Sequence, residues 1–345
     1  MMNESQTNTE LMEKAMSPRL CFGRDLIEKQ SAGWQNALVI TMPEVWEQAR
    51  PLFKKGPAHL HFVESMDQEV VEAAEARLPA SGLIVGIGGG MALDMAKYAA
   101  WKKGAPFLLV PSIASVDACV TNTIAIRDKG RVRYVGFVVP EAVLSDFTLM
   151  EKAAPRLNRA GIGDILSIHT GSFDWKLAAS RNKDNYDKKA AAETALLVDG
   201  LETMAGVVRQ VTDEALEWLV RAYAAENRVC LQVGHSRPEE GSEHYFCYNL
   251  EYLTGKGFVH GEIVCLGVLL MSRLQENRPH RVARILEETG VRYQPADLGI
   301  SKDEIFESLL SLPDYVRSES LPYSIINERE PGEELIKHMT ADLEF

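Results

Sequence analysis

One carboxylate and two imidazoles in the second half of this 345-residue chain form a potential metal-binding set. Asp164 ends the segment Ala-Gly-Ile-Gly-Asp, His244 ends Gly-Ser-Glu-His, and His260 lies in Val-His-Gly-Glu. An Asp and two His residues suit zinc or ferrous iron in a catalytic site that leaves positions open for substrate or water. Taken singly, Asp164 is explained as a helix N-cap and each His as a packed or surface residue. The set as a whole favours a metal site.

A second group of residues has the pattern of a phosphate-binding turn. An apolar run, Leu83-Ile84-Val85, leads into Gly88, Gly89 and Gly90 and then into a helical stretch. Backbone N–H groups at the start of a helix, with the helix dipole, can bind a pyrophosphate, so the turn suits a dinucleotide. Met91 breaks the usual GxGxxG spacing, and glycines in such a turn also serve purely steric needs.

Small polar residues follow the next apolar strand. Ser112, Ser115 and Asp117 come after Phe107-Leu108-Leu109-Val110. In a parallel sheet the carboxyl ends of strands form the edge where ligands bind. Ser and Asp are also ordinary turn and cap residues, so this segment indicates a ligand site only because the glycine turn accompanies it.

The elements that must position these residues differ between the two halves. Short β-rich runs alternate with helical stretches up to about Pro140, at 37–41, 59–63, 82–86 and 106–111, which predicts βαβ units and a parallel sheet covered on both faces. After about Ala154 long helical patterns follow, at 164–179, 188–208, 214–231, 241–253, 261–277, 280–289 and 302–312. The fold class is therefore α/β: an N-terminal Rossmann-like parallel-sheet domain followed by an all-α C-terminal domain.

Chain length predicts two domains. We place a polar N-terminal tail at 1–20, a dinucleotide-binding α/β domain at 21–154 and an all-helical metal and substrate domain at 155–345. The boundary falls before Pro155, because proline disfavours helix in the residue that precedes it.

Composition excludes several classes of protein. The formal net charge of −12 disfavours a large nucleic-acid or anionic-membrane surface. No apolar run reaches the roughly 20 residues needed to cross a bilayer, and no segment resembles a secretory signal. The five cysteines include no CxxC pair and are expected to be buried, reduced thiols. We expect a cytoplasmic homo-oligomer that acts on a small molecule, with no nucleic-acid partner and no membrane insertion.

Five motifs in order give the chain a family resemblance over roughly residues 80 to 275. The motifs are GIGGGxxxDxxK, PSxASxDA, AGxGDILS, GSEH and HGE. The chain resembles the metal-dependent dehydrogenases that comprise glycerol-1-phosphate dehydrogenase, glycerol dehydrogenase and the iron-containing alcohol dehydrogenases, with 3-dehydroquinate synthase as a fold relative. GSEH is most similar to the glycerol-1-phosphate dehydrogenases.

The resemblance implies site residues at matching positions. Asp164, His244 and His260 correspond to the three metal ligands, and Asp117 to the junction of cofactor and substrate. NAD or NADP would be held by a larger set, namely Gly88, Gly89, Gly90, Asp94, Ser112, Ser115 and Thr121.

Two positions bear on the metal and on the substrate. The long-chain iron enzymes carry an additional His one helical turn after the Asp, where this chain has Ile168, which favours zinc over iron or nickel. The glycerol-1-phosphate enzymes carry a substrate-binding His four residues after the first ligand His, where this chain has Tyr248. Tyr248 is therefore a candidate substrate contact, and the substrate itself is left open.

The predicted activity is metal-dependent reduction of a small hydroxyketone or aldehyde by NAD(P)H, with a phosphorylated substrate as one option. Glycerol dehydrogenase is one alternative. A lyase similar to 3-dehydroquinate synthase is another, although such synthases have Glu where this chain has Asp164. A fold that has lost catalysis and only binds is a third, which the intact metal set disfavours.

Overall fold

The fold is taken from a computed structural model that describes residues 4–345. It contains two compact units, one of residues 4–158 with 216–228 and one of residues 159–215 with 229–345. Helices α7 (Pro155–Arg159) and α10 (Asp213–Val233) therefore contribute residues to both units. The sequence-based division at residues 154 and 155 did not anticipate that residues 216–228 group with the first unit.

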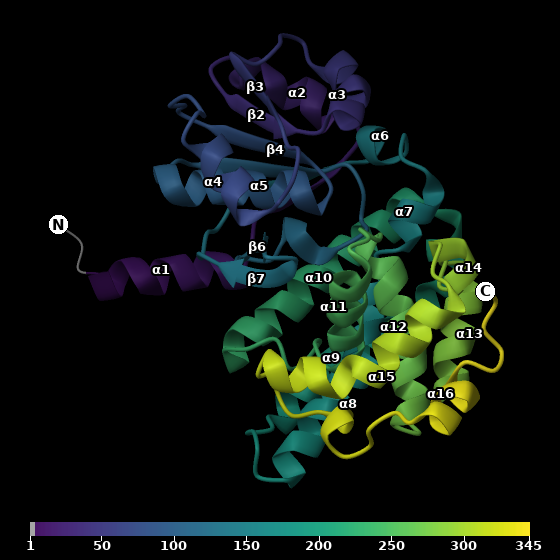
Figure 1. The fold of residues 1–345 in the computed structure, drawn as a ribbon. Coiled ribbons are helices and arrows are strands. Elements are labelled where there is room, and N and C mark those ends of the chain that lie inside the picture. Colours follow the sequence, from purple (N-terminus) through teal and green to yellow (C-terminus); the bar gives the residue numbers. More distant parts are fainter. Residues whose placement is uncertain (1–3) are drawn as a thin grey trace. The chain divides into compact units, whose positions relative to one another are not determined.

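The first unit is built on a parallel sheet of six strands in the order β1-β8-β5-β4-β2-β3. Figure 1 labels β2, β3 and β4 of this sheet. The strands are β1 (Leu20–Gly23), β2 (Leu38–Thr41), β3 (His59–Phe62), β4 (Ile84–Gly88), β5 (Phe107–Pro111) and β8 (Ala142–Asp146). The predicted α/β class is confirmed. The four predicted strands correspond to β2, β3, β4 and β5.

The sheet core is made by strand residues that alternate between two covered faces. Val85 and Ile87 of β4 pack in one cluster with Trp34 and with Val39 of β2, all of them buried. Gly86, on the opposite face of β4, meets helix α5 so closely that an added Cβ would lie 2.5 Å from the Cβ of Ala96. Burial on both faces explains why these strands are continuous apolar runs.

Helices of the first unit are mostly short. They are α1 (Glu4–Met16), α2 (Leu26–Gln30), η1 (Ser31–Gly33), α3 (Pro43–Ala49), η2 (Arg50–Leu52), α4 (Gln68–Glu75), α5 (Gly90–Lys103), η3 (Asp117–Cys119) and α6 (Phe147–Met150). Helix α1 occupies most of the segment that we predicted to be a polar tail. Its residue Ala15 is buried, so this part of the segment packs against the fold.

A β-hairpin, which the sequence analysis did not predict, follows the sheet strands β4 and β5. Strands β6 (Ile124–Asp128) and β7 (Arg131–Val135) are antiparallel. Their connection, Lys129 and Gly130, has φ angles of 51° and 78°. Two positive φ values in a two-residue loop are the signature of the type I′ turn, whose twist matches that of paired strands.

The second unit is helical, and residues 159–215 and 229–345 contain no strand. Besides parts of α7 and α10, its elements are α8 (Ile162–Ser180), α9 (Lys188–Gln210), α11 (Ser242–Thr254), α12 (His260–Leu274), α13 (Pro279–Thr289), α14 (Pro295–Leu298), α15 (Lys302–Ser318), η4 (Ile325–Asn327) and α16 (Glu333–Met339). The predicted helices lie within a few residues of these bounds. Helix α15 continues past Pro313, beyond the predicted end.

No helix within residues 4–345 combines the length and the apolar character needed to cross a bilayer. All five cysteines are free. Cys119, Cys230, Cys247 and Cys265 are buried, as the sequence analysis expected, whereas Cys21 is only partly buried.

Candidate active site

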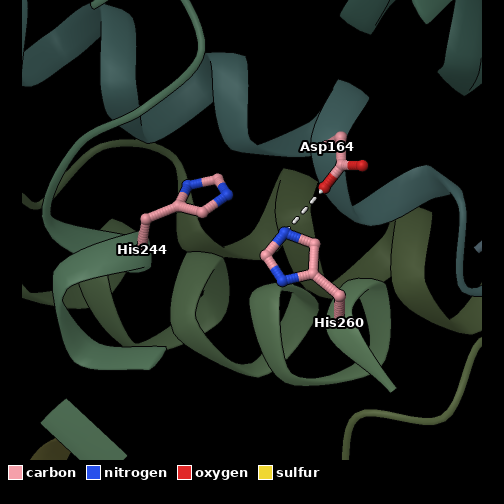
Figure 2. A group of neighbouring side chains, drawn as sticks. All are labelled: Asp164, His244 and His260. Atoms are coloured by element: carbon pink, nitrogen blue, oxygen red, sulfur yellow. Dashed lines mark ion pairs between the residues drawn. The ribbon is translucent and has the colours of Figure 1, made fainter. Parts of the chain in front are cut away.

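The second unit brings Asp164, His244 and His260 together from three helices. Asp164 lies in the first turn of α8, His244 in the first turn of α11, and His260 is the first residue of α12. One ligand atom of each residue lies within 4.8 Å of those of the other two. The Nε2 atom of His260 is 3.3 Å from Oδ1 of Asp164, and the ring centroids of His244 and His260 are 5.4 Å apart. Figure 2 shows all three side chains directed toward one point.

These three residues fit a divalent metal ion. Ligands about 2.0 to 2.2 Å from a tetrahedral zinc ion stand roughly 3.4 Å from one another, so small side-chain movements would complete the geometry. Asp164 and His244 are buried, with 5% and 6% of their surface exposed. The side chain of His260 is 32% exposed. Three protein donors with one partly open side leave room for a substrate oxygen.

Glycines let the ligand-bearing helices approach one another closely. Gly163, next to Asp164, faces Gly261, next to His260, and a Cβ on Gly163 would lie 2.6 Å from the Cα atom of Gly261. A Cβ on Gly267 of α12 would lie 2.7 Å from the carbonyl oxygen of Glu243. A side chain at either glycine would force the helix backbones apart. The ligand positions are therefore set by backbone contacts between helices.

The surroundings of His244 strongly affect its pKa. Burial favours its neutral form, but the hydrogen bond and the charge of Glu243, with smaller effects of Glu240 and Asp164, outweigh burial and raise the pKa of His244 to about 9. The surroundings of this imidazole thus favour positive charge. A metal cation would take the place of that proton, because only the neutral nitrogen binds metal.

The buried cysteines of α11 and α12, Cys247 and Cys265, do not join the ligand set. Burial, and then the charges of nearby carboxylates, raises the pKa of both Cys247 and Cys265 well above the ordinary value. The thiolate is the form that binds metal. Both side chains therefore remain protonated and act as small apolar core residues.

A buried carboxylate, Asp174 of α8, anchors the start of α11. Its two oxygens accept hydrogen bonds from the backbone N–H groups of Ser242 and Ile325, both at 2.8 Å. Burial is the largest effect on this group, and the negative charge of Glu243 adds to it, so that the pKa of Asp174 rises to about 6.

This raised pKa predicts a pH-dependent contribution to stability. A carboxyl group whose folded pKa exceeds its ordinary value of 3.8 stabilises the fold fully at pH values below 3.8, and the contribution is lost as the pH rises through about 6. We expect the difference in free energy of unfolding between wild type and Asp174→Asn to fall by up to about 3 kcal/mol between about pH 4 and pH 7. Denaturant titrations across this range measure it, and parallel pH profiles would contradict it.

In the first unit, the predicted phosphate-binding turn joins β4 to α5. The register pairs Gly88 with Pro111, so the carboxyl ends of β4 and β5 are level, and Ser112 donates its N–H to the carbonyl oxygen of Gly88 at 2.9 Å. β4 lies between β5 and β2. The chain passes from β4 to β5 on one side and from β2 to β3 on the other, so the turn after β4 lies at a topological switch point.

The glycines of this turn have both steric and binding value. A Cβ on Gly88 would lie 2.6 Å from the Cβ of Ala92, so close packing of α5 explains that glycine. Gly89 is the N-cap of α5 and has no side chain to cap it. The first N–H groups of a helix have no partner within the helix, so they can bind an anion. The turn fits the pyrophosphate of a dinucleotide.

Asp94 and Thr121, which the sequence analysis placed at the cofactor, both contact the buried side chain of Lys97. The Lys97 Nζ atom lies 2.6 Å from Oδ1 of Asp94 and donates to the Thr121 hydroxyl at 3.4 Å and to the Thr123 carbonyl at 2.9 Å. Lys97 is fully buried. Burial raises the pKa of Asp94, and the neighbouring Lys97 opposes that rise. Asp94 thus forms an ion pair with Lys97, and Lys97 donates hydrogen bonds to the segment that carries Thr121.

Comparison with known proteins accords with both halves of this arrangement. Residues 38–155 match the family described as iron-containing alcohol dehydrogenase. The glycerol-1-phosphate dehydrogenase (NAD(P)+) of Hyperthermus butylicus is 28% identical over 314 residues, which cover 88% of each chain. The enzyme of the same name from Aeropyrum pernix is 29% identical, with 77% of this chain and 74% of that one covered. This chain belongs to the iron-containing alcohol dehydrogenase family.

The fold of this dehydrogenase is also that of solved structures. A probable glycerol dehydrogenase from Sinorhizobium meliloti 1021 superimposes with a TM-score of 0.71 at 22% identity, over 94% of this chain and 96% of that one. At this identity the likeness concerns the fold alone. The predicted order of a sheet domain and a helical domain is thereby confirmed.

Tyr248 of the dehydrogenase lies on the same face of α11 as His244, as the four-residue spacing predicted. The two rings have centroids 6.0 Å apart. The Tyr248 hydroxyl donates to Oε1 of Glu240 at 2.9 Å. Glu240 in turn accepts a hydrogen bond from the Ser236 hydroxyl at 2.7 Å. An acidic side chain therefore accompanies Tyr248 near the candidate metal site.

The segment carrying Ser112, Ser115 and Asp117 is held by residues that the sequence analysis did not single out. Between the two serines, the Ala114 N–H donates to Oδ1 of Asn158 and the Ala114 carbonyl accepts from the Tyr223 hydroxyl, both at 2.9 Å. Ser112 and Ser115 are buried, and Asp117 begins η3. Asn158 and Tyr223 lie 44 and 109 positions after Ala114 in the sequence. Sequence spacing carries no signal for such distant partners.

Proposed function

We propose that this dehydrogenase catalyses the reversible reduction of dihydroxyacetone phosphate to glycerol 1-phosphate with NADH or NADPH. The ketone, a hydride from the reduced nicotinamide and one proton give the secondary alcohol and NAD(P)+. The observation that carries the proposal is the convergence of Asp164, His244 and His260 in a chain similar over most of its length to glycerol-1-phosphate dehydrogenases.

Each group of residues has a defined part in this proposal. Asp164, His244 and His260 would hold one divalent metal ion, with zinc favoured and iron or nickel as alternatives. Bound metal supplies a Lewis acid for the carbonyl, and bound NAD(P)H supplies the hydride. Gly88, Gly89 and Gly90 would bind the cofactor pyrophosphate through backbone N–H groups, and further cofactor contacts would come from Asp94, Ser112, Ser115 and Thr121. Asp117 and Tyr248 would contact substrate.

One observation favours an unphosphorylated substrate, as in glycerol dehydrogenases. The Tyr248 hydroxyl donates a hydrogen bond to Glu240, and the negative charge of Glu240 contributes to the raised pKa of His244. A carboxylate repels a phosphate dianion, whereas it can accept a hydrogen bond from a polyol hydroxyl. Dihydroxyacetone is therefore the second candidate substrate.

Oxidation of NADH and NADPH by the metal-loaded protein tests the proposal. We expect turnover with dihydroxyacetone phosphate that exceeds turnover with dihydroxyacetone and is abolished by a chelator. Preference for dihydroxyacetone would select the second candidate. If neither ketone is reduced by a protein that binds metal and dinucleotide, both are wrong, and a cyclase or lyase reaction without net NAD(P)H oxidation becomes the one to test. The homo-oligomeric state and the cytoplasmic location remain predictions.

A further inference from the structure

We infer that Glu243 is a positioning residue for the metal site: its carboxylate holds the His244 imidazole so that Nε2 is the nitrogen offered to the metal. This role rests on the proposed metal-dependent function. Glu243 would not itself bind the metal, but it would determine how His244 binds it.

The contacts of Glu243 are well defined. Its side chain is fully buried, and one oxygen, Oε1, lies 2.9 Å from Nδ1 of His244 and accepts the Gly241 N–H at 2.6 Å. Consecutive side chains on a helix ordinarily point in different directions. Here the Gly241 N–H, just before the first turn of α11, holds the carboxylate back toward the imidazole. The Glu243–His244 contact is thus set by the start of the helix.

This contact determines which nitrogen of His244 is free. A neutral imidazole has one N–H and one lone pair, and a carboxylate only accepts hydrogen bonds. With Nδ1–H donated to Glu243, the lone pair lies on Nε2. Figure 2 shows that the ring nitrogen of His244 farther from its backbone is the one directed toward Asp164 and His260. A carboxylate behind a ligand His also makes the imidazole a stronger donor to the metal.

Zinc affinity, measured by competition with a chromophoric chelator, tests the role without relying on activity. Loss of such a carboxylate typically lowers metal affinity 10- to 100-fold. We expect about tenfold weaker binding for Glu243→Gln, which keeps an acceptor without the charge, and about a hundredfold for Glu243→Ala. Glu251→Gln, the same substitution two turns later on α11, should stay within about twofold. Wild-type affinity in both Glu243 variants would overturn the inference.

A measurement on the wild-type protein keeps the inference testable if the variants do not fold. In the zinc-loaded protein, ¹⁵N–¹H NMR of the histidine side chains should show a slowly exchanging proton on Nδ1 of His244 and none on Nε2. A proton on Nε2 would overturn the inference. A protein that binds zinc in this way but reduces neither ketone would refute the proposed function alone. Zinc binding that is unaffected by Glu243, in an active enzyme, would refute the positioning role alone.

Discussion

Replacing His260 by alanine is expected to remove tight metal binding and to lower kcat/KM for ketone reduction about a thousandfold. His260 supplies one of three donors, and two remaining side chains leave the ion weakly held. Metal-assisted carbonyl polarisation contributes several kcal/mol to transition-state stabilisation, and a loss of about 4 kcal/mol corresponds to a factor of roughly 10³. Metal content after gel filtration and steady-state kinetics measure the two effects.

His260 suits this experiment because its side chain is partly exposed, so truncation leaves the core intact. His280→Ala provides a matched control: it changes the same residue type at an exposed position of α13 in the same unit. The control should retain metal and activity. Full metal content and full activity in His260→Ala would show that the cluster of Asp164, His244 and His260 is not the catalytic metal site.

Replacing Gly163 by alanine is expected to destabilise the protein by about 3 kcal/mol and to weaken metal binding at least tenfold. The added methyl would meet the Cα atom and the carbonyl oxygen of Gly261, each at 2.6 Å. Overpacking commonly costs about 1–3 kcal/mol, and this contact falls at the upper end because backbone atoms cannot rotate away. Helix α12 must move relative to α8, and Asp164 and His260 separate with it.

Gly206→Ala is the control for the Gly163 experiment. Gly206 lies in the exposed part of α9, where an added Cβ would meet no atom within 4 Å. Glycine in a helix interior is less favourable than alanine by roughly 0.5–1 kcal/mol, so this variant should be slightly more stable than wild type. Denaturant titrations and zinc titrations on both variants make the comparison. A Gly163→Ala protein with unchanged zinc affinity would show that the Gly163–Gly261 contact does not position the ligands.

The two experiments address different levels of the same site. His260→Ala removes a donor and leaves the helices in place, whereas Gly163→Ala keeps every donor and moves the helices. Because α8 and α12 meet at glycines adjacent to Asp164 and His260, the stability of the metal-free protein and the metal affinity should fall together only in Gly163→Ala. Zinc should also raise the unfolding temperature of wild type, since a ligand that binds only the folded state stabilises it.

The sequence alone predicted four of the six sheet strands, the long helices of the second unit and the donor residues of a candidate metal site. Continuous apolar runs specify strands covered on both faces, and the 3.6-residue pattern specifies the long helices, because each reflects local burial. The types and order of Asp164, His244 and His260 predict a metal site, and the structure brings the three side chains together. Each of these features is readable within a short segment or from motif order.

Tertiary structure decided how those residues are paired and held. β1 joins the sheet beside β8, more than 100 residues later, and Lys97 ties Asp94 to the segment of Thr121. Gly163 meets Gly261, and Asp174 anchors the backbone of Ser242. These contacts depend on which helices and strands pack together, and local periodicity does not contain that information. Physical proximity in the folded chain, not spacing along it, sets the geometry of the ligands.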